Sequence, residues 1–136
     1  MSNRNKEEIA GIIRNTLITK HGYEVDGIYV RKPITENFGI GFSHDNEYTL
    51  CISIYHKEGV QFSPTQKKTI FDVLSRPEFS GKYSDADEGE TSDGKSEIWA
   101  TLKIDAFDGW ESADIADWIV RLYEHFITTL ELLALN

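Results

Sequence analysis

The fold is decided by Ser112–Ala134, which reads SADIADWIVRLYEHFITTLELLA. Its apolar side chains recur at the three- and four-residue intervals of an amphipathic helix. These side chains are Ile115, Trp118, Ile119, Leu122, Phe126, Ile127, Leu130 and Leu133. Ser112 can cap the helix, and Asp114 and Asp117 suit the positive end of its dipole. The sequence therefore predicts a C-terminal helix more than about 30 Å long.

The apolar side of this predicted helix is wider than packing on one sheet requires. The group from Trp118 through Ile119 and Tyr123 to Ile127 and Val120 covers about 200°, whereas one sheet uses a stripe of about 100°. The surplus indicates a second partner for the helix, and a like helix across a two-fold axis is the simplest one. We therefore expect a homodimer.

Two further helices are predicted upstream. Apolar residues recur with helical spacing from Asn5 to about Lys20, and Gly22 can end that helix in a left-handed conformation. Ser63-Pro64-Thr65-Gln66 is typical of a helix start, because Ser63 and Gln66 can form a capping box. Arg76-Pro77 ends this second helix.

Alternation of apolar and polar residues predicts the strands, which are Tyr23–Lys32, Phe38–Phe42, Tyr48–Tyr55 and Ile98–Ile104. The first three form an antiparallel meander, with a turn at His44–Glu47. The polar stretch Tyr83–Glu97 is interpreted as a long exposed hairpin loop with room for short strand ends. The prediction is one α+β domain over residues 1–136. Its two layers are an antiparallel sheet and helices, in the order α-β-β-β-α-β-(β)-α.

Composition excludes several classes of protein. The 136 residues carry 14 Lys and Arg against 23 Asp and Glu, a net charge of -9, which argues against direct nucleic-acid binding. A single cysteine, Cys51, excludes an internal disulfide and fits a reducing compartment. The N-terminus is too polar for a signal peptide, and no apolar run reaches the ~20 residues of a membrane helix. We expect a cytoplasmic protein with no membrane contact.

The acidity is concentrated in the C-terminal part of the chain. Residues 1–83 contain 11 basic and 10 acidic residues, whereas residues 84–136 contain 3 basic and 13 acidic ones. The same part holds all three tryptophans, and exposed tryptophans are enriched at protein interfaces. We therefore predict a surface there for a partner protein with a basic or extended contact segment. The predicted surface residues are Trp99, Trp110, Trp118, Tyr123, Ile127, Asp85, Asp87, Glu88 and Glu90.

The acidic stretch does not form a coherent metal or catalytic motif. The alternate spacing of its acidic residues is similar to that of a calcium-binding loop. However, Glu90 occupies the position that requires glycine, and Ser96 occupies the position that requires glutamate. Asp93-Gly94-Lys95 matches the acidic-x-lysine signature of metal-dependent nucleases, although it lies in a predicted loop. A metal-dependent hydrolase is therefore the weakest of three interpretations. We expect no catalytic residue, no metal and no cofactor.

The predicted element order, size and acidity resemble the class I chaperones of bacterial type III secretion. That resemblance implies a cytosolic homodimer without enzymatic activity, which holds extended segments along apolar patches. The stretch from Ile98 through Trp110 and Asp117-Trp118 to Phe126 resembles the end of an uncharacterised bacterial domain joined to restriction or nuclease modules. This second resemblance implies a non-catalytic role beside a defence or DNA-processing system.

These observations favour a non-enzymatic, acidic protein-binding module that acts as an adaptor or in a chaperone-like way. The alternative is an acidic inhibitor, or a mimic of DNA, from a phage, immunity or restriction system. The two differ in their sensitivity to salt, because ionic screening weakens charge pairing far more than apolar contact.

Overall fold

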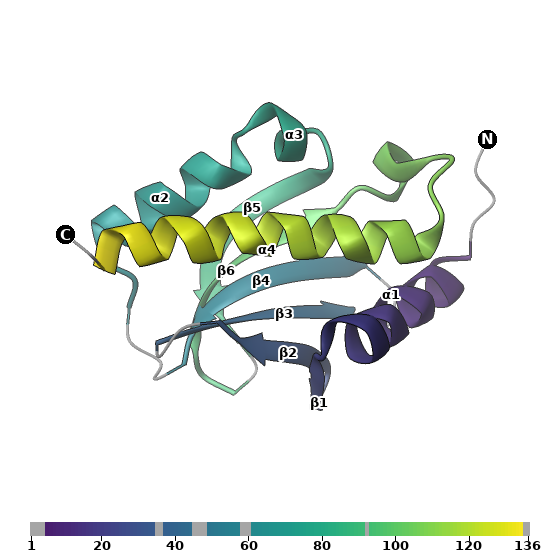
Figure 1. Ribbon diagram of the computed structural model, residues 1–136, viewed down its shortest axis with the longest axis horizontal. Coiled ribbons are helices and arrows are strands. Elements are labelled where there is room, and N and C mark those ends of the chain that lie inside the picture. Colours follow the sequence, from purple (N-terminus) through teal and green to yellow (C-terminus); the bar gives the residue numbers. More distant parts are fainter. Residues whose placement is uncertain (1–4, 35–36, 45–48, 58–60, 92, 135–136) are drawn as a thin grey trace.

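The computed structural model describes residues 5–34, 37–44, 49–57, 61–91 and 93–134. The helical elements are α1 (Lys6–His21), α2 (Pro64–Leu74), α3 (Pro77–Ser80), the 3-10 helix η1 (Ile104–Phe107) and α4 (Ser112–Ala134). The strands are β1 (Glu24–Asp26), β2 (Tyr29–Pro33), β3 (Phe38–His44), β4 (Leu50–His56), β5 (Tyr83–Glu90) and β6 (Ser96–Leu102). The strands form one antiparallel sheet in the order β1-β2-β3-β4-β6-β5 (Figure 1). The predicted α+β class and element order are confirmed, with β1, α3 and η1 as additions.

Local signals begin and end α1 and α2 where the sequence predicts. The Asn5 side chain accepts hydrogen bonds from the backbone N–H groups of Glu7 and Glu8, and Gly22 ends α1 with φ of 76°. Ser63 and Gln66 form the expected capping box. The Ser63 backbone N–H donates to Gln66 Oε1 at 2.8 Å, and the Gln66 backbone N–H donates to Ser63 Oγ at 3.1 Å. These contacts satisfy backbone donors that the helix itself leaves unpaired.

Three predicted segments differ from the structure. Tyr23–Lys32 is not one strand, because the chain reverses at Gly27, whose φ of 62° suits a tight hairpin between β1 and β2. Tyr83–Glu97 is mostly not a loop: β5 pairs with β6 over its length, and pairing overrides the low strand propensity of its Asp, Glu and Gly residues. The last predicted strand ends at Leu102, and Ile104 begins η1. Residues 45–48, in the predicted turn and third strand, lie outside the described residues.

The sheet has one face covered by helices and one open face on which no helix of the described chain lies. On the helix-covered face, Val30, Phe42, Ile52 and Ala100 are cross-strand neighbours and belong to the buried core. On the open face, the corresponding row is Arg31, Gly41, Ser53, Trp99 and Asp87. The open face is therefore mainly polar and aromatic.

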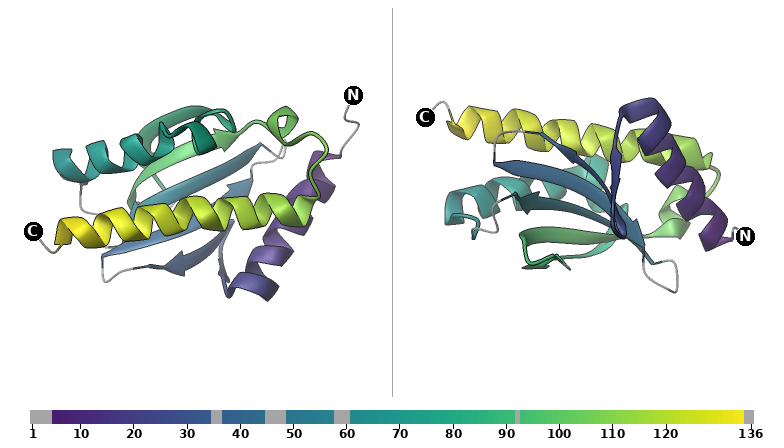
Figure 2. Two further views of the ribbon diagram at one scale, coloured as in Figure 1. Left: turned by 45° about the horizontal axis from the view of Figure 1, so that its top comes forward. Right: turned by 90° about the horizontal axis from the view of Figure 1, so that it is seen from below.

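Helix α4 lies across the sheet, with α1 on one side of it and α2 with α3 on the other (Figures 1 and 2). Trp118 is 2% exposed and contacts Phe79 of α3 and Phe107 of η1, while Tyr123 is 1% exposed and reaches the sheet. Neighbours within the chain thus cover most of the wide apolar side that favoured a homodimer. The side chain of Leu133 lies outside the described residues. Among the described helices, none combines the length and the apolar character needed to span a membrane.

Candidate protein-binding surface

Trp110 stands between two hollows at the N-terminal ends of α1 and α4. The first hollow, of about 390 Å³, lies between the starts of the two helices. It is lined by Asn5, Glu8, Ile9, Ile12 and residues 109–113. The second, of about 430 Å³, is lined by Gly109, Trp110, Asp114, Asp117 and Arg121. Because both include Gly109 and Trp110, the two hollows adjoin along this short segment.

Local contacts hold the Trp110 side chain half-buried between these hollows. Its ring packs edge-to-face on Phe107, with centroids 5.3 Å apart, and Lys82 Nζ lies 4.9 Å from the ring centroid. The Trp110 backbone N–H donates to the Phe107 carbonyl at 2.9 Å, and Lys82 Nζ donates to the Ala106 carbonyl at 2.6 Å. The indole is therefore positioned by η1 and Lys82 before any partner binds.

The first hollow combines apolar side chains with an acidic rim. Ile9 is buried in its floor, whereas Ile12 is 40% exposed, which is unusual for a large apolar side chain in this protein. Glu8 and Glu111 are exposed, and the lining contains no basic residue. Both carboxylates lie near helix N-termini, where the helix dipole favours negative charge. We call Glu8, Ile9, Ile12, Trp110 and Glu111 the Trp110 surface; its chemistry suits a segment that carries both apolar and cationic groups.

Two of the predicted surface residues belong to the core. Trp118 and Tyr123 are almost fully buried, and the Trp118 indole Nε1–H donates to the Glu78 carbonyl at 3.4 Å. The Tyr123 hydroxyl accepts from the Ser53 backbone N–H at 3.2 Å and donates to the Gly41 carbonyl, so it joins α4 to β3 and β4. Burial raises the pKa of Tyr123 well above its usual value. Neither side chain is available to a partner on the surface.

The remaining predicted residues are dispersed. Ile127 is half-buried on α4, and Trp99 is half-buried on the open face, where its indole lies over Gly89. The acidic residues Asp85, Asp87, Glu88 and Glu90 lie on β5, at the edge of the sheet. Asp87 is the cross-strand neighbour of Trp99 on the open face, whereas Glu88 reaches the opposite face and binds Lys67 of α2 at 3.0 Å. Only Trp110, of the nine predicted residues, lies on the Trp110 surface.

A polar cluster on the open face was not predicted from the sequence. Arg31 is 5% exposed, stacks over the rings of Tyr29 and Tyr55, and binds Asp93 and Asp26. Burial raises the pKa of Glu97, and the nearby Arg31 partly offsets this effect. Among the described residues, Arg31 Nε, Ser53 Oγ and Glu97 Oε2 are buried without a hydrogen-bond partner. The alternation of polar residues along β2, β4 and β6 was a signal for this cluster, but only the register brings them together.

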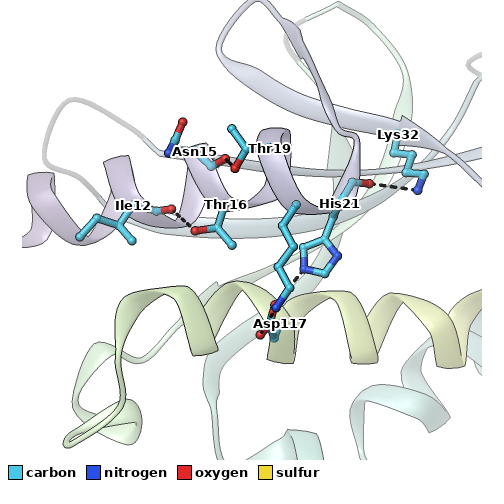
Figure 3. Close-up of polar contacts among 8 residues, drawn as sticks. Ile12, Asn15, Thr16, Thr19, His21, Lys32 and Asp117 are labelled. Carbon is cyan, nitrogen blue, oxygen red and sulfur yellow. Dashed lines mark hydrogen bonds and ion pairs between the residues drawn. The ribbon is translucent and has the colours of Figure 1, made fainter.

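A second missed cluster joins α1 to α4 (Figure 3). Asp117 accepts hydrogen bonds from Lys20 Nζ at 2.9 Å and lies 2.8 Å from His21 Nε2, while the His21 carbonyl accepts from Lys32 Nζ. His21 and Lys20 hold the pKa of Asp117 below its usual value. A His–Asp pair also occurs in hydrolytic triads, but no hydroxyl or thiol of the described residues is hydrogen-bonded to His21. The cluster therefore links α1 to α4 through the contacts of Lys20 and His21 with Asp117.

The residues of the metal-site interpretation have other partners. Asp93 binds Arg31, and Lys95 Nζ donates to the Lys57 carbonyl at 3.0 Å. In the described parts of the chain, no three His, Cys, Asp or Glu side chains are grouped closely enough to hold a metal ion. Asp93 and Lys95 therefore connect the turn after β5 to β2 and to the residue that follows β4.

Comparisons with protein-family models, with curated proteins and with solved structures found no match to this chain. The resemblances to secretion chaperones and to a restriction-linked domain therefore stay predictions. Function has to be argued from the surface itself.

Proposed function

We propose that this protein is a non-catalytic, acidic binding module whose Trp110 surface receives a basic segment of another protein. Its role would be that of an adaptor or a chaperone-like protein in the cytoplasm, the compartment that a single cysteine, Cys51, suits. The observation that carries the proposal is the hollow of about 390 Å³. Its lining has the exposed Ile12 and the half-buried Trp110 beside Glu8 and Glu111, and no basic residue.

Physical chemistry supports this pairing of groups. An aromatic side chain held in place before binding loses little conformational entropy on contact, which is one reason why tryptophan is frequent among interface anchors. Carboxylates at the rim attract a cationic segment and orient it, although they add less to affinity than the apolar contact. Trp110 between Glu8 and Glu111 combines both contributions.

The proposal does not require a second copy of the chain. The apolar residues of α4 that favoured a homodimer pack against the sheet and against α1, α2 and α3. The acidic side chains of β5 are also divided between two faces of the sheet, as Asp87 and Glu88 illustrate. This division gives the DNA-mimic alternative less support than the Trp110 surface gives to protein binding.

Fluorescence anisotropy with two labelled peptides tests the proposal. The probes are a short peptide of alternating lysine and leucine and its counterpart of alternating glutamate and leucine. We expect the lysine peptide alone to bind. Trp110→Ala should weaken its affinity about tenfold or more, as is typical of an interface anchor. Glu8→Gln with Glu111→Gln should weaken it less, and most at low salt.

The matched controls are Trp99→Ala and Glu90→Gln, which change the same residue types elsewhere on the protein. Both should bind the lysine peptide like the unmodified chain. Equal binding of the two peptides, or equal loss in Trp110→Ala and Trp99→Ala, contradicts the proposal. Complete loss of binding at about 300 mM salt would instead favour a purely electrostatic, DNA-mimic type of contact.

A further inference from the structure

A third hollow, of about 430 Å³, lies along α4, on the side where α2 ends and α3 begins. It is lined by Arg76, Arg121, Glu124, His125, Thr128 and Thr129. Arg76 comes from the connection between α2 and α3, and the other residues come from α4. Two arginines and a histidine thus meet in one hollow of a protein whose net charge is -9.

Arg76 is held in this hollow by His125. Its Nη1 lies 2.7 Å from His125 Nδ1, and the histidine ring packs edge-to-face on Phe79, with centroids 5.1 Å apart. A guanidinium can only donate hydrogen bonds, so Nδ1 is the acceptor and the neutral imidazole carries its proton on Nε2. The half-buried guanidinium therefore has a set orientation and further N–H groups for another acceptor.

The arginines of the hollow form no ion pair with the residues that the structure describes. Lys20, Arg31, Lys67 and Lys68 each bind a carboxylate. Across the described residues, by contrast, neither Arg76 nor Arg121 has a carboxylate within 4.0 Å. Glu124, the only acidic side chain in the lining, is exposed and makes no ion pair with described residues.

The threonines of the lining do not add donors. The Thr128 hydroxyl donates to the Glu124 carbonyl at 3.0 Å, and the Thr129 hydroxyl donates to the His125 carbonyl at 2.8 Å. A ligand in the hollow therefore meets mainly guanidinium N–H groups, from two separate elements. Guanidinium groups match the oxygens of phosphate in a bidentate geometry and bind them more strongly than neutral donors do.

We propose that the hollow formed by Arg76, Arg121 and His125 binds a phosphate group. Arg76, oriented by His125, supplies a fixed pair of donors, and Arg121 supplies the second positive charge from α4. The hollow shares none of the five residues of the Trp110 surface, although Arg121 also lines the second hollow beside Trp110. The phosphate proposal does not depend on the proposed function.

The test is an NMR titration with inorganic phosphate at constant ionic strength, with sodium chloride as balancing salt. We expect saturable shifts confined to the Arg76, Arg121 and His125 signals. Arg121→Gln should weaken the affinity about tenfold, the scale of one charged hydrogen bond. Arg14→Gln on α1 is the control, because it removes the same charge away from the hollow and should bind phosphate normally.

Acetate titrated under the same conditions separates phosphate recognition from binding of any anion. Weaker shifts with acetate than with phosphate support the proposal. Equal shifts with both, shifts spread over all basic residues, or equal affinities of Arg121→Gln and Arg14→Gln overturn it. The exposed position of Arg121 makes its variant a test of binding rather than of folding.

Discussion

The carboxylate of Asp93 accepts two hydrogen bonds from the guanidinium of Arg31, at 3.0 and 3.1 Å. Asp93 lies in the turn between β5 and β6, and β3 and β4 separate β2 from β6 in the sheet. The turn must therefore fold over the open face to reach Arg31. The ion pair between Arg31 and Asp93 therefore lies over the face of the sheet that no described helix covers.

Loss of the Asp93 carboxylate should destabilise the fold. In Asp93→Asn, the buried guanidinium of Arg31 keeps only the exposed Asp26 as a charged partner. We expect the free energy of unfolding in urea to fall by about 1–3 kcal/mol. Glu90→Gln removes the same charge from an exposed position and should change it by less than about 0.5 kcal/mol. Equal effects of the two variants would show that the pair is not stabilising.

Acid should weaken the protein through Asp93 and Asp117. Arg31 and Thr91 hold the pKa of Asp93 below its usual range, and His21 and Lys20 do the same for the pKa of Asp117. Below about pH 4 the unfolded chain then binds more protons than the folded one, so stability is lost as pH falls towards the lowered pKa values. Urea unfolding from pH 7 to pH 3 checks this. Asp93→Asn should flatten the curve, and an unchanged slope would contradict this origin.

Glu97 should have the opposite dependence on pH. Burial raises its pKa, so its contribution is most favourable below its unfolded-state value of about 4.3 and is lost as pH rises above it. Glu97→Gln removes a carboxylate whose Oε2 has no partner among the described residues. We expect this variant to be more stable than the unmodified chain at pH 8 but not at pH 4. A variant that is less stable at pH 8 would mean that the carboxylate binds a favourable partner.

Gly39 should be intolerant of a side chain. A Cβ at this position would lie 2.3 Å from Cζ of Tyr55, whose ring covers the glycine on the open face. Gly39→Ala should cost about 1–3 kcal/mol, and much less in a Tyr55→Ala background, because the two positions are coupled. Gly11→Ala is the control, since nothing lies within 4 Å of its added Cβ and α1 gains a better helix former. Equal costs in both backgrounds would exclude the clash.

Helices and strands with strong local signals were predictable. The start of α1 at Asn5, the capping box at Ser63 and the long helix α4 depend on residues within a few positions of each other. Strand β5 was predicted only as short strand ends of an exposed loop, because its polar sequence has little strand signal of its own. It becomes a strand because β6 offers it an edge to pair with.

The candidate sites were less predictable than the fold. Periodicity indicated the wide apolar side of α4, but it could not tell burial of Trp118 and Tyr123 within the chain from contact with a second copy. Trp110 was the predicted residue that lines both hollows near the start of α4. The acidic residues in the turn next to Trp110 were the sequence signal for this residue.

The sequence by itself determined the fold class, the caps of the first two helices, the long C-terminal helix and the concentration of acidity after Tyr83. Only the tertiary structure decided which polar side chains distant in the sequence are paired. Arg31 and Asp93 are 62 residues apart, and Arg76 and His125 are 49 apart. Local patterns arise from neighbours along the chain. Contacts at such separations depend on strand register and on how α4 lies on the sheet, which many weak interactions set together.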